Sequence, residues 1–153
     1  MRTASHVEKF QRLTDLRTRL DPLEHFELWY WTTLTAGTNA YNACLHLAGL
    51  TSDDPVFSTI PGVHLAPQPD GGYARVLRGP GDVSHVGWPP IEGEIPEDIQ
   101  CLEIALEALE EHRDPCLRGE RSPTRYIVGE CEREFERVQA ILFARAGVKE
   151  TVS

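Results

Sequence analysis

Apolar side chains recur at intervals of three and four residues along much of the chain, which is the spacing of one face of an α-helix. Three segments show this pattern, at residues 4–20, at about 97–112 and at about 122–146. In the first segment the apolar positions are Val7, Phe10, Leu13, Leu16 and Leu20. The second has Ile99, Leu102, Leu106 and Leu109, and the third has Ile127, Cys131, Phe135, Val138 and Leu142. Each segment therefore predicts an amphipathic helix, the last with Ser122 as its N-cap.

A further segment, residues 21–48, is apolar on nearly every side. Asp21 is a favourable N-cap, Pro22 suits the first helical turn, and Glu24 completes a capping-box pattern. Gly49 suits the C-terminal cap of a helix that ends near residue 48. A helix without a polar face belongs in the middle of a bundle, so we expect this one to form the centre of the core.

The same segment raises the question of a membrane span, because residues 28–52 contain no Asp, Glu, Lys or Arg. About 20 apolar residues suffice to cross a bilayer. However, this stretch contains Thr32, Thr33, Thr35, Thr38, Asn39, Asn42 and His46, and no Lys or Arg occurs between Asp21 and Ala74. A polar content this high, without cationic flanks, favours a helix buried within a bundle.

The connection between the second and third helices, about residues 50–95, is unusually long for a compact domain. Its middle reads as a β-hairpin: GVHLA and YARVL flank PQPDGG, in which Asp70–Gly71 is typical of a turn. An isolated hairpin is marginally stable in water, so we expect it to pack on the bundle and cover the second helix. The sequence thus predicts a single all-α domain, residues 1–153, formed by a bundle of four main helices with a long inserted loop that contains a short β-hairpin.

The composition limits the classes of partner. The chain has 153 residues and a formal net charge of -9, which disfavours nucleic acid and anionic membranes as partners. Its four cysteines form no CxxC pair, so a zinc knuckle is disfavoured. Residues 1–20 carry charges throughout and lack the apolar core of a secretory signal, so we expect reduced thiols and a cytoplasmic protein.

Four polar residues of the central helix share one face, because their spacings are four, three and four: Thr35, Asn39, Asn42 and His46. Buried polar groups need hydrogen-bond partners, and we expect residues 56–90 to supply them. Two interpretations remain. The four side chains either tie the loop to the helix or line a ligand pocket between the two.

Residues of the loop extend this candidate site. His64 and His85 could join His46 to hold a divalent metal, or all three could be ordinary hydrogen-bonded histidines. Arg75 and Arg78 could offer donors to a small acidic ligand, although an interval of three in a strand lets at most one of them face the pocket. Apart from this metal alternative we predict no cofactor.

A second cluster of charges lies between the third and fourth helices. Four arginines occur within thirteen residues: Arg113, Arg118, Arg121 and Arg125. They could form an anion site near the start of a helix, or they could balance the eight acidic residues of segment 92–111.

No nucleophile elbow or phosphate-binding loop occurs in the chain, so whether it is an enzyme stays open. The first functional hypothesis is a bundle that acts through self-association, as a homodimer, or through a protein partner. The aromatic run LWYW at residues 28–31 supports it, since one neighbouring helix cannot cover every apolar face of that run. The alternative is a protein or enzyme that binds a small molecule or a metal between the second helix and the loop.

Overall fold

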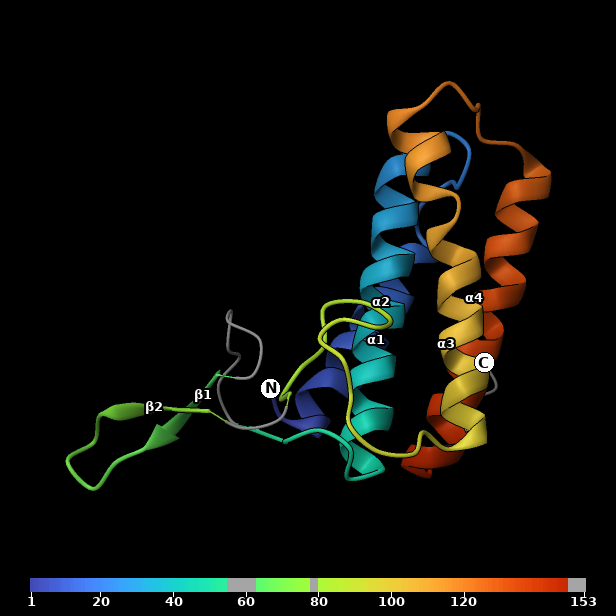
Figure 1. The fold of residues 1–153 in the computed structure, drawn as a ribbon. Helices are drawn as coiled ribbons and strands as arrows, with labels where there is room; N and C mark the ends of the chain where they lie inside the picture. Colours follow the sequence, from blue (N-terminus) through green and yellow to red (C-terminus); the bar gives the residue numbers. More distant parts are fainter. Residues whose placement is uncertain (55–62, 78–79, 149–153) are drawn as a thin grey trace.

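The computed structural model of the chain describes residues 1–54, 63–77 and 80–148. Four helices, α1 (Thr3–Arg17), α2 (Phe26–Leu47), α3 (Glu97–Glu110) and α4 (Arg125–Ala146), run side by side in alternating directions (Figure 1). A short π-helical turn, η1 (Asp114–Arg118), follows α3. A two-stranded hairpin lies between α2 and α3. The predicted class, an all-α bundle with an inserted loop and hairpin, is confirmed.

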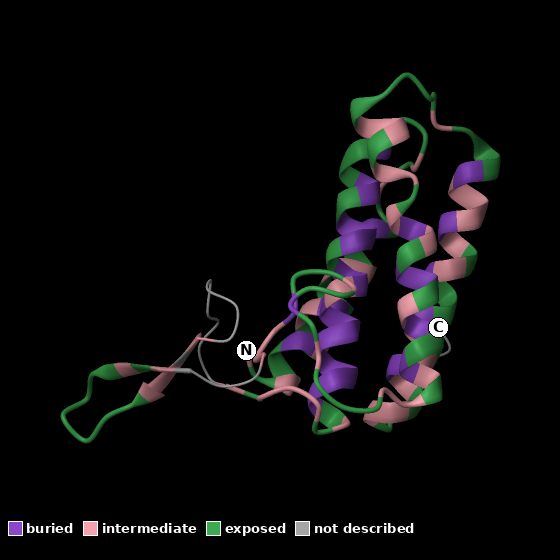
Figure 2. Ribbon diagram, viewed as in Figure 1, coloured by how far each residue is buried: buried purple, intermediate pink, exposed green. Residues whose placement is uncertain are grey.

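Helix α2 is the centre of the core, as its apolar sequence predicts. It packs against each of the other three helices, and buried residues continue along almost its whole length (Figure 2). Its largest buried side chains are Trp29, Tyr30, Tyr41 and Leu45. Among the described helices, none is both long enough and apolar enough to cross a membrane.

Two helices begin later than the sequence predicts. Asp21 does accept hydrogen bonds from the N–H groups of Leu23 and Glu24, at 3.0 and 2.8 Å, but these close a separate turn, and α2 begins at Phe26. Likewise α4 is capped by Thr124 rather than Ser122, because the Thr124 hydroxyl accepts the N–H of Ile127. In both cases a residue with capping chemistry lies ahead of the true helix.

The end of α2 follows the prediction. Gly49 has φ 74°, a left-handed conformation that favours glycine. The N–H of Leu50 donates to the carbonyl of Leu45, and the N–H of Gly49 donates to that of His46. This pair of bonds is a Schellman motif, which satisfies carbonyls that the helix leaves open.

The buried face of α1 differs from the apolar stripe that the sequence suggests. Its buried residues are His6, Phe10 and Arg17, whereas Leu16 is 41% exposed. Arg17 can be buried because the Glu132 carboxylate lies 3.0 Å from its guanidinium and the ring centroid of Phe135 lies 4.1 Å away. The helix is therefore turned so that two ionisable side chains, each with partners, face inward.

The hairpin forms where it is predicted but does not pack where it is expected. Strands β1 (Val63–Pro67) and β2 (Tyr73–Leu77) are antiparallel, and Gly71 takes φ 85° in the turn between them. The hairpin projects away from the bundle (Figure 1). The expectation that it covers α2 is wrong, because residues 80–88 take that place and the hairpin is left with exposed polar positions near its turn.

Helices α2 and α3 approach closely at Gly37, where an added Cβ would lie 2.5 Å from Leu106 Cδ2. We expect Gly37→Ala to lower the free energy of unfolding by about 1–3 kcal/mol, since a well-packed core resists extra volume. Gly129→Ala on α4 is the matched control, because its new Cβ would lie at an ordinary 3.6 Å from the Arg133 guanidinium. There the gain in helix propensity should stabilise by about 0.5–1 kcal/mol. Urea denaturation of both variants measures the difference, and equal shifts would contradict the close approach.

Candidate functional site

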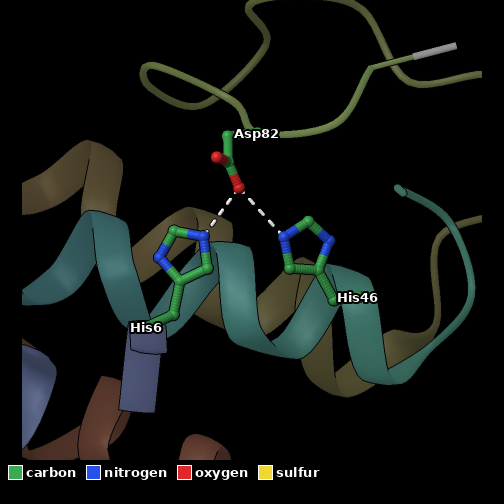
Figure 3. A group of neighbouring side chains, drawn as sticks. All are labelled: His6, His46 and Asp82. Carbon is green, nitrogen blue, oxygen red and sulfur yellow. Dashed lines mark hydrogen bonds and ion pairs between the residues drawn. The ribbon is translucent and has the colours of Figure 1, made fainter. Parts of the chain in front are cut away.

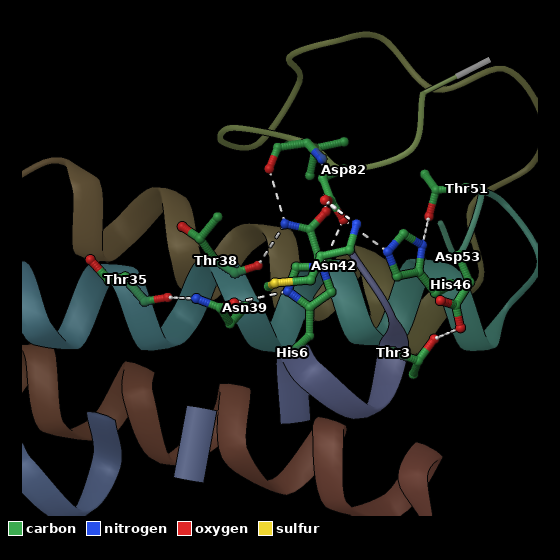
Figure 4. Close-up of polar contacts among 12 residues, drawn as sticks. Thr3, His6, Thr35, Thr38, Asn39, Asn42, His46, Thr51, Asp53 and Asp82 are labelled. Carbon is green, nitrogen blue, oxygen red and sulfur yellow. Dashed lines mark hydrogen bonds and ion pairs between the residues drawn. The ribbon is translucent and has the colours of Figure 1, made fainter. Parts of the chain in front are cut away.

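The polar face of α2 meets two different segments of the chain (Figure 4). Asn42 and His46 face the loop at residues 80–88, as expected. Asn39 instead faces His6 of α1, at 2.8 Å. Thr35 is exposed, and its hydroxyl donates back to the carbonyl of Trp31. The polar face is thus divided: α1 and residues 80–88 cover its C-terminal half, and Thr35 is left exposed.

Asn42 fixes the loop through both groups of its side-chain amide. Its Oδ1 accepts the backbone N–H of Val83 at 2.7 Å, and its Nδ2 donates to the carbonyl of the same residue at 3.0 Å. The side chain of Val83 is buried in the core. One buried amide therefore satisfies a loop residue that would otherwise bring unpaired backbone groups into the interior.

The adjacent residue, Asp82, is the meeting point of three segments. Its Oδ1 lies 2.6 Å from His6 Nε2 and 2.9 Å from His46 Nε2 (Figure 3). The two imidazole rings have centroids 5.3 Å apart. Two imidazole nitrogens, one from α1 and one from α2, thus converge on one carboxylate oxygen.

This cluster is shielded from solvent, and its hydrogen bonds favour the charged form of Asp82. His6, His46 and the Asp82 side chain are all nearly buried, and the amino group of Met1 lies 2.5 Å from Asp82 Oδ2. Burial acts to raise the pKa of Asp82. Hydrogen bonds from His46, His6 and the amino group of Met1 outweigh it and hold that pKa well below its usual range. Asp82 is therefore a carboxylate at neutral pH.

The Nδ1 atom of each ring, which faces away from Asp82, lies within hydrogen-bond distance of a neighbouring side chain. His46 Nδ1 lies 2.6 Å from the Thr51 hydroxyl. His6 Nδ1 faces Asn39 Oδ1, whose identity as the oxygen is set because Asn39 Nδ2 donates to the carbonyl of Thr35. His6 therefore has an acceptor at both ring nitrogens. Between its Nε2 and Asp82 there must be either a proton or a metal ion.

Of the expected metal set, His46 with His64 and His85, the structure places His46 in the cluster around Asp82 and His85 outside it. Among the described residues, the group whose ligand atoms lie within 4.8 Å of one another is His6, His46 and Asp82. His85 is exposed, and its Nδ1 faces the carbonyl of Val86 in its own loop. His64 belongs to β1, and its side chain lies outside the described part of the chain.

The two loop arginines stay apart from this cluster. Arg75 is exposed on the projecting strand β2, and Arg78 lies outside the described residues. The structure therefore brings together His46, Asn42 and Asn39 of the predicted site, and leaves Thr35, His85 and Arg75 outside its centre.

Sequence reasoning missed His6 and Asp82. A signal for His6 existed, since His6, Phe10, Leu13 and Arg17 repeat the four, three, four spacing that marks the polar face of α2. The alternative stripe through Val7 is more apolar and hid it. Asp82 lies in a Gly- and Pro-rich loop, where an isolated acidic residue carries no periodic signal.

The two hydrogen bonds between the Asn42 side chain and the backbone of Val83 generate a prediction about the loop. We expect Asn42→Ala to lower the free energy of unfolding by about 2–4 kcal/mol, because two buried backbone groups lose their partner. Gln100→Ala is the control, since Gln100 makes one exposed bond to the carbonyl of Ile95. Denaturant unfolding gives the energies, and hydrogen exchange at the Val83 amide should rise only in the Asn42 variant. Equal losses in both variants would contradict the anchoring role.

Comparison of the chain with protein-family models, with curated proteins and with solved structures found no match. A fold alone does not define an activity, which resides in a particular arrangement of side chains. The functional argument for this chain therefore starts from the geometry around Asp82.

Proposed function

We propose that the protein binds one divalent transition-metal ion through His6, His46 and Asp82. The observation that carries this proposal is the meeting of two imidazole Nε2 atoms at a single carboxylate oxygen, at 2.6 and 2.9 Å. Ligating histidines usually have the other ring nitrogen hydrogen-bonded, which fixes the tautomer and the ring orientation. Asn39 and Thr51 hold the two Nδ1 atoms in this way.

The donor set indicates the class of metal. Two imidazoles and one carboxylate suit zinc or ferrous iron, and three protein ligands leave a coordination position open. Metal–ligand bonds of about 2.0–2.2 Å place neighbouring donor atoms about 3 Å apart in an octahedral site and about 3.3–3.6 Å apart in a tetrahedral one, so the donors need to separate by up to about 1 Å. The competing explanation is a metal-free cluster in which Asp82 holds α1 and α2 together by hydrogen bonds alone.

Titration calorimetry with Zn²⁺ and absorption spectroscopy with Co²⁺ distinguish these explanations. We expect one ion per chain in the native protein, and a higher melting temperature with metal present. His6→Gln and Asp82→Asn should each weaken binding by more than about 100-fold, since removing even an outer hydrogen-bond partner of a ligand costs about 10–100-fold. Asn39→Ala keeps all three ligands, so its loss of metal affinity should be in the smaller range of about 10–100-fold.

His25→Gln is the control for these variants, because His25 is exposed and lies outside the cluster. Circular dichroism of the metal-free variants shows whether each retains its helices. A native protein that binds no more metal than a folded His6→Gln variant would leave only the hydrogen-bonded role for the cluster.

We also propose self-association as a homodimer, for a different reason. Leu28, near the start of α2, is 56% exposed. Apolar surface left open on a central helix is typical of an interface.

Light scattering at micromolar concentration tests the dimer. We expect twice the monomer mass for the native protein, and the monomer mass for Leu28→Glu, because a buried unpaired charge disfavours association. Ile104→Glu is the control, since Ile104 is also exposed, at 63%, but lies on α3. A native protein of monomer mass would refute this proposal and leave the metal site unaffected.

A further inference from the structure

A groove of about 290 Å³ lies beside the uncovered half of the polar face of α2. Its walls come from three places: the outer face of α2, the loop residues Ser84 and His85, and the C-terminal end of α3 with the residues that follow it. The volume is near the lower end for small-molecule sites, which begin at about 300 Å³. A molecule of the size of one amino acid therefore suits the groove.

The end of α3 contributes one charge of each sign to this groove, from Glu110 and Arg113. Arg113 follows three residues after Glu110, where α3 ends. Within the described residues these two side chains form no ion pair with each other. Arg113 is instead paired with Asp114, whose carboxylate oxygen lies 3.5 Å from Nε, and the buried Nε–H makes no hydrogen bond.

The opposite wall is mostly apolar. Trp31 and Leu34 line it, followed by the hydroxyls of Thr35 and Thr38. The Trp31 side chain is 38% exposed, so part of its ring is open to a ligand. An apolar wall facing one carboxylate and one guanidinium is complementary to a molecule with an apolar group, an ammonium and a carboxylate.

We infer that this groove binds a small zwitterion of the α-amino-acid type with an apolar side chain. Arg113 receives the carboxylate, Glu110 receives the ammonium, and Trp31 packs against the side chain. A simple acid would leave the charge of Glu110 without a partner, and a simple amine would leave Arg113 with only its 3.5 Å contact to the exposed Asp114. This site uses Arg113 as its cation, in place of the loop arginines that the sequence suggested.

The test uses ¹⁵N-labelled, metal-free protein, so its outcome does not depend on the metal site. The probes are L-phenylalanine, 3-phenylpropanoate, which lacks the amine, and 2-phenylethylamine, which lacks the carboxylate. We expect L-phenylalanine to shift the indole N–H signal of Trp31 saturably, while that of the buried Trp29 stays unchanged. Each of the other two probes should bind at least about 10-fold more weakly, because it lacks the group that would interact with Glu110 or with Arg113.

Charge-neutral variants assign the two roles. Glu110→Gln should bring the affinities for L-phenylalanine and 3-phenylpropanoate close together, and Arg113→Gln should do the same for L-phenylalanine and 2-phenylethylamine. Glu107→Gln and Arg118→Gln are the controls, since neither residue lines the groove. The inference would be overturned if the Trp31 signal showed no saturable shift at about 10 mM L-phenylalanine, a concentration far above the dissociation constant of a typical ligand. Affinity ratios that respond to the control variants as they do to the variants of the groove would also overturn it.

Discussion

The position of Asp82 is the constraint on which the rest of this structure depends. A carboxylate taken out of water needs several donors, and here they come from α1, from α2 and from the amino group of Met1. Because these donors are far apart in sequence, the hydrogen bonds to one side chain hold the first helix, the central helix and the long loop in a single arrangement. The loop is also attached to the bundle by Val83, next to Asp82: its side chain is buried in the core, and its backbone makes two hydrogen bonds with the Asn42 side chain.

Both inward-facing ionisable residues of α1 follow the same physical rule. His6 lies between Asn39 and Asp82, and Arg17 lies against Phe135 with Glu132 beside it. A buried charge without partners would cost several kcal/mol, so each of these residues has partners on at least two other segments. Between them, Phe10 stacks on Phe135 with ring centroids 5.6 Å apart. The bundle therefore has an apolar middle with a polar cluster toward each end of α1.

The proposed metal site and the proposed amino-acid groove share one side chain. Asn39 lines the groove and also accepts the hydrogen bond from His6 Nδ1. A ligand that contacts Asn39 from the groove would act on a residue that orients a metal ligand, and linkage then requires metal and ligand to affect each other's binding equally. On these two proposals, the covered half of the polar face would hold the metal ligands, and its open half would line the groove.

The sequence by itself determined the helices and the hairpin. Periodic apolar residues predict α1, α3 and α4 because a helix that buries one face must repeat at 3.6 residues, and α2 is predicted by its nearly continuous apolar sequence. Asp70–Gly71 predicts the turn because glycine takes a positive φ there. The sequence also singled out Asn39, Asn42 and His46, since polar residues at helical spacing on an apolar helix require partners.

Only the tertiary structure decided which residues are the hydrogen-bond partners of this polar face. Nothing local distinguishes Asp82 from a polar loop residue, and the helical spacing of His6 does not reveal its partner, because their contacts span 76 and 36 positions of the chain. The direction of the hairpin was undetermined for the same reason, since residues 80–88 cover the face of α2 that the hairpin was expected to cover. Helical periodicity indicates that a helix forms, but the face that is buried, as in α1, and the segment that covers it are selected by packing and hydrogen bonding over long distances in sequence.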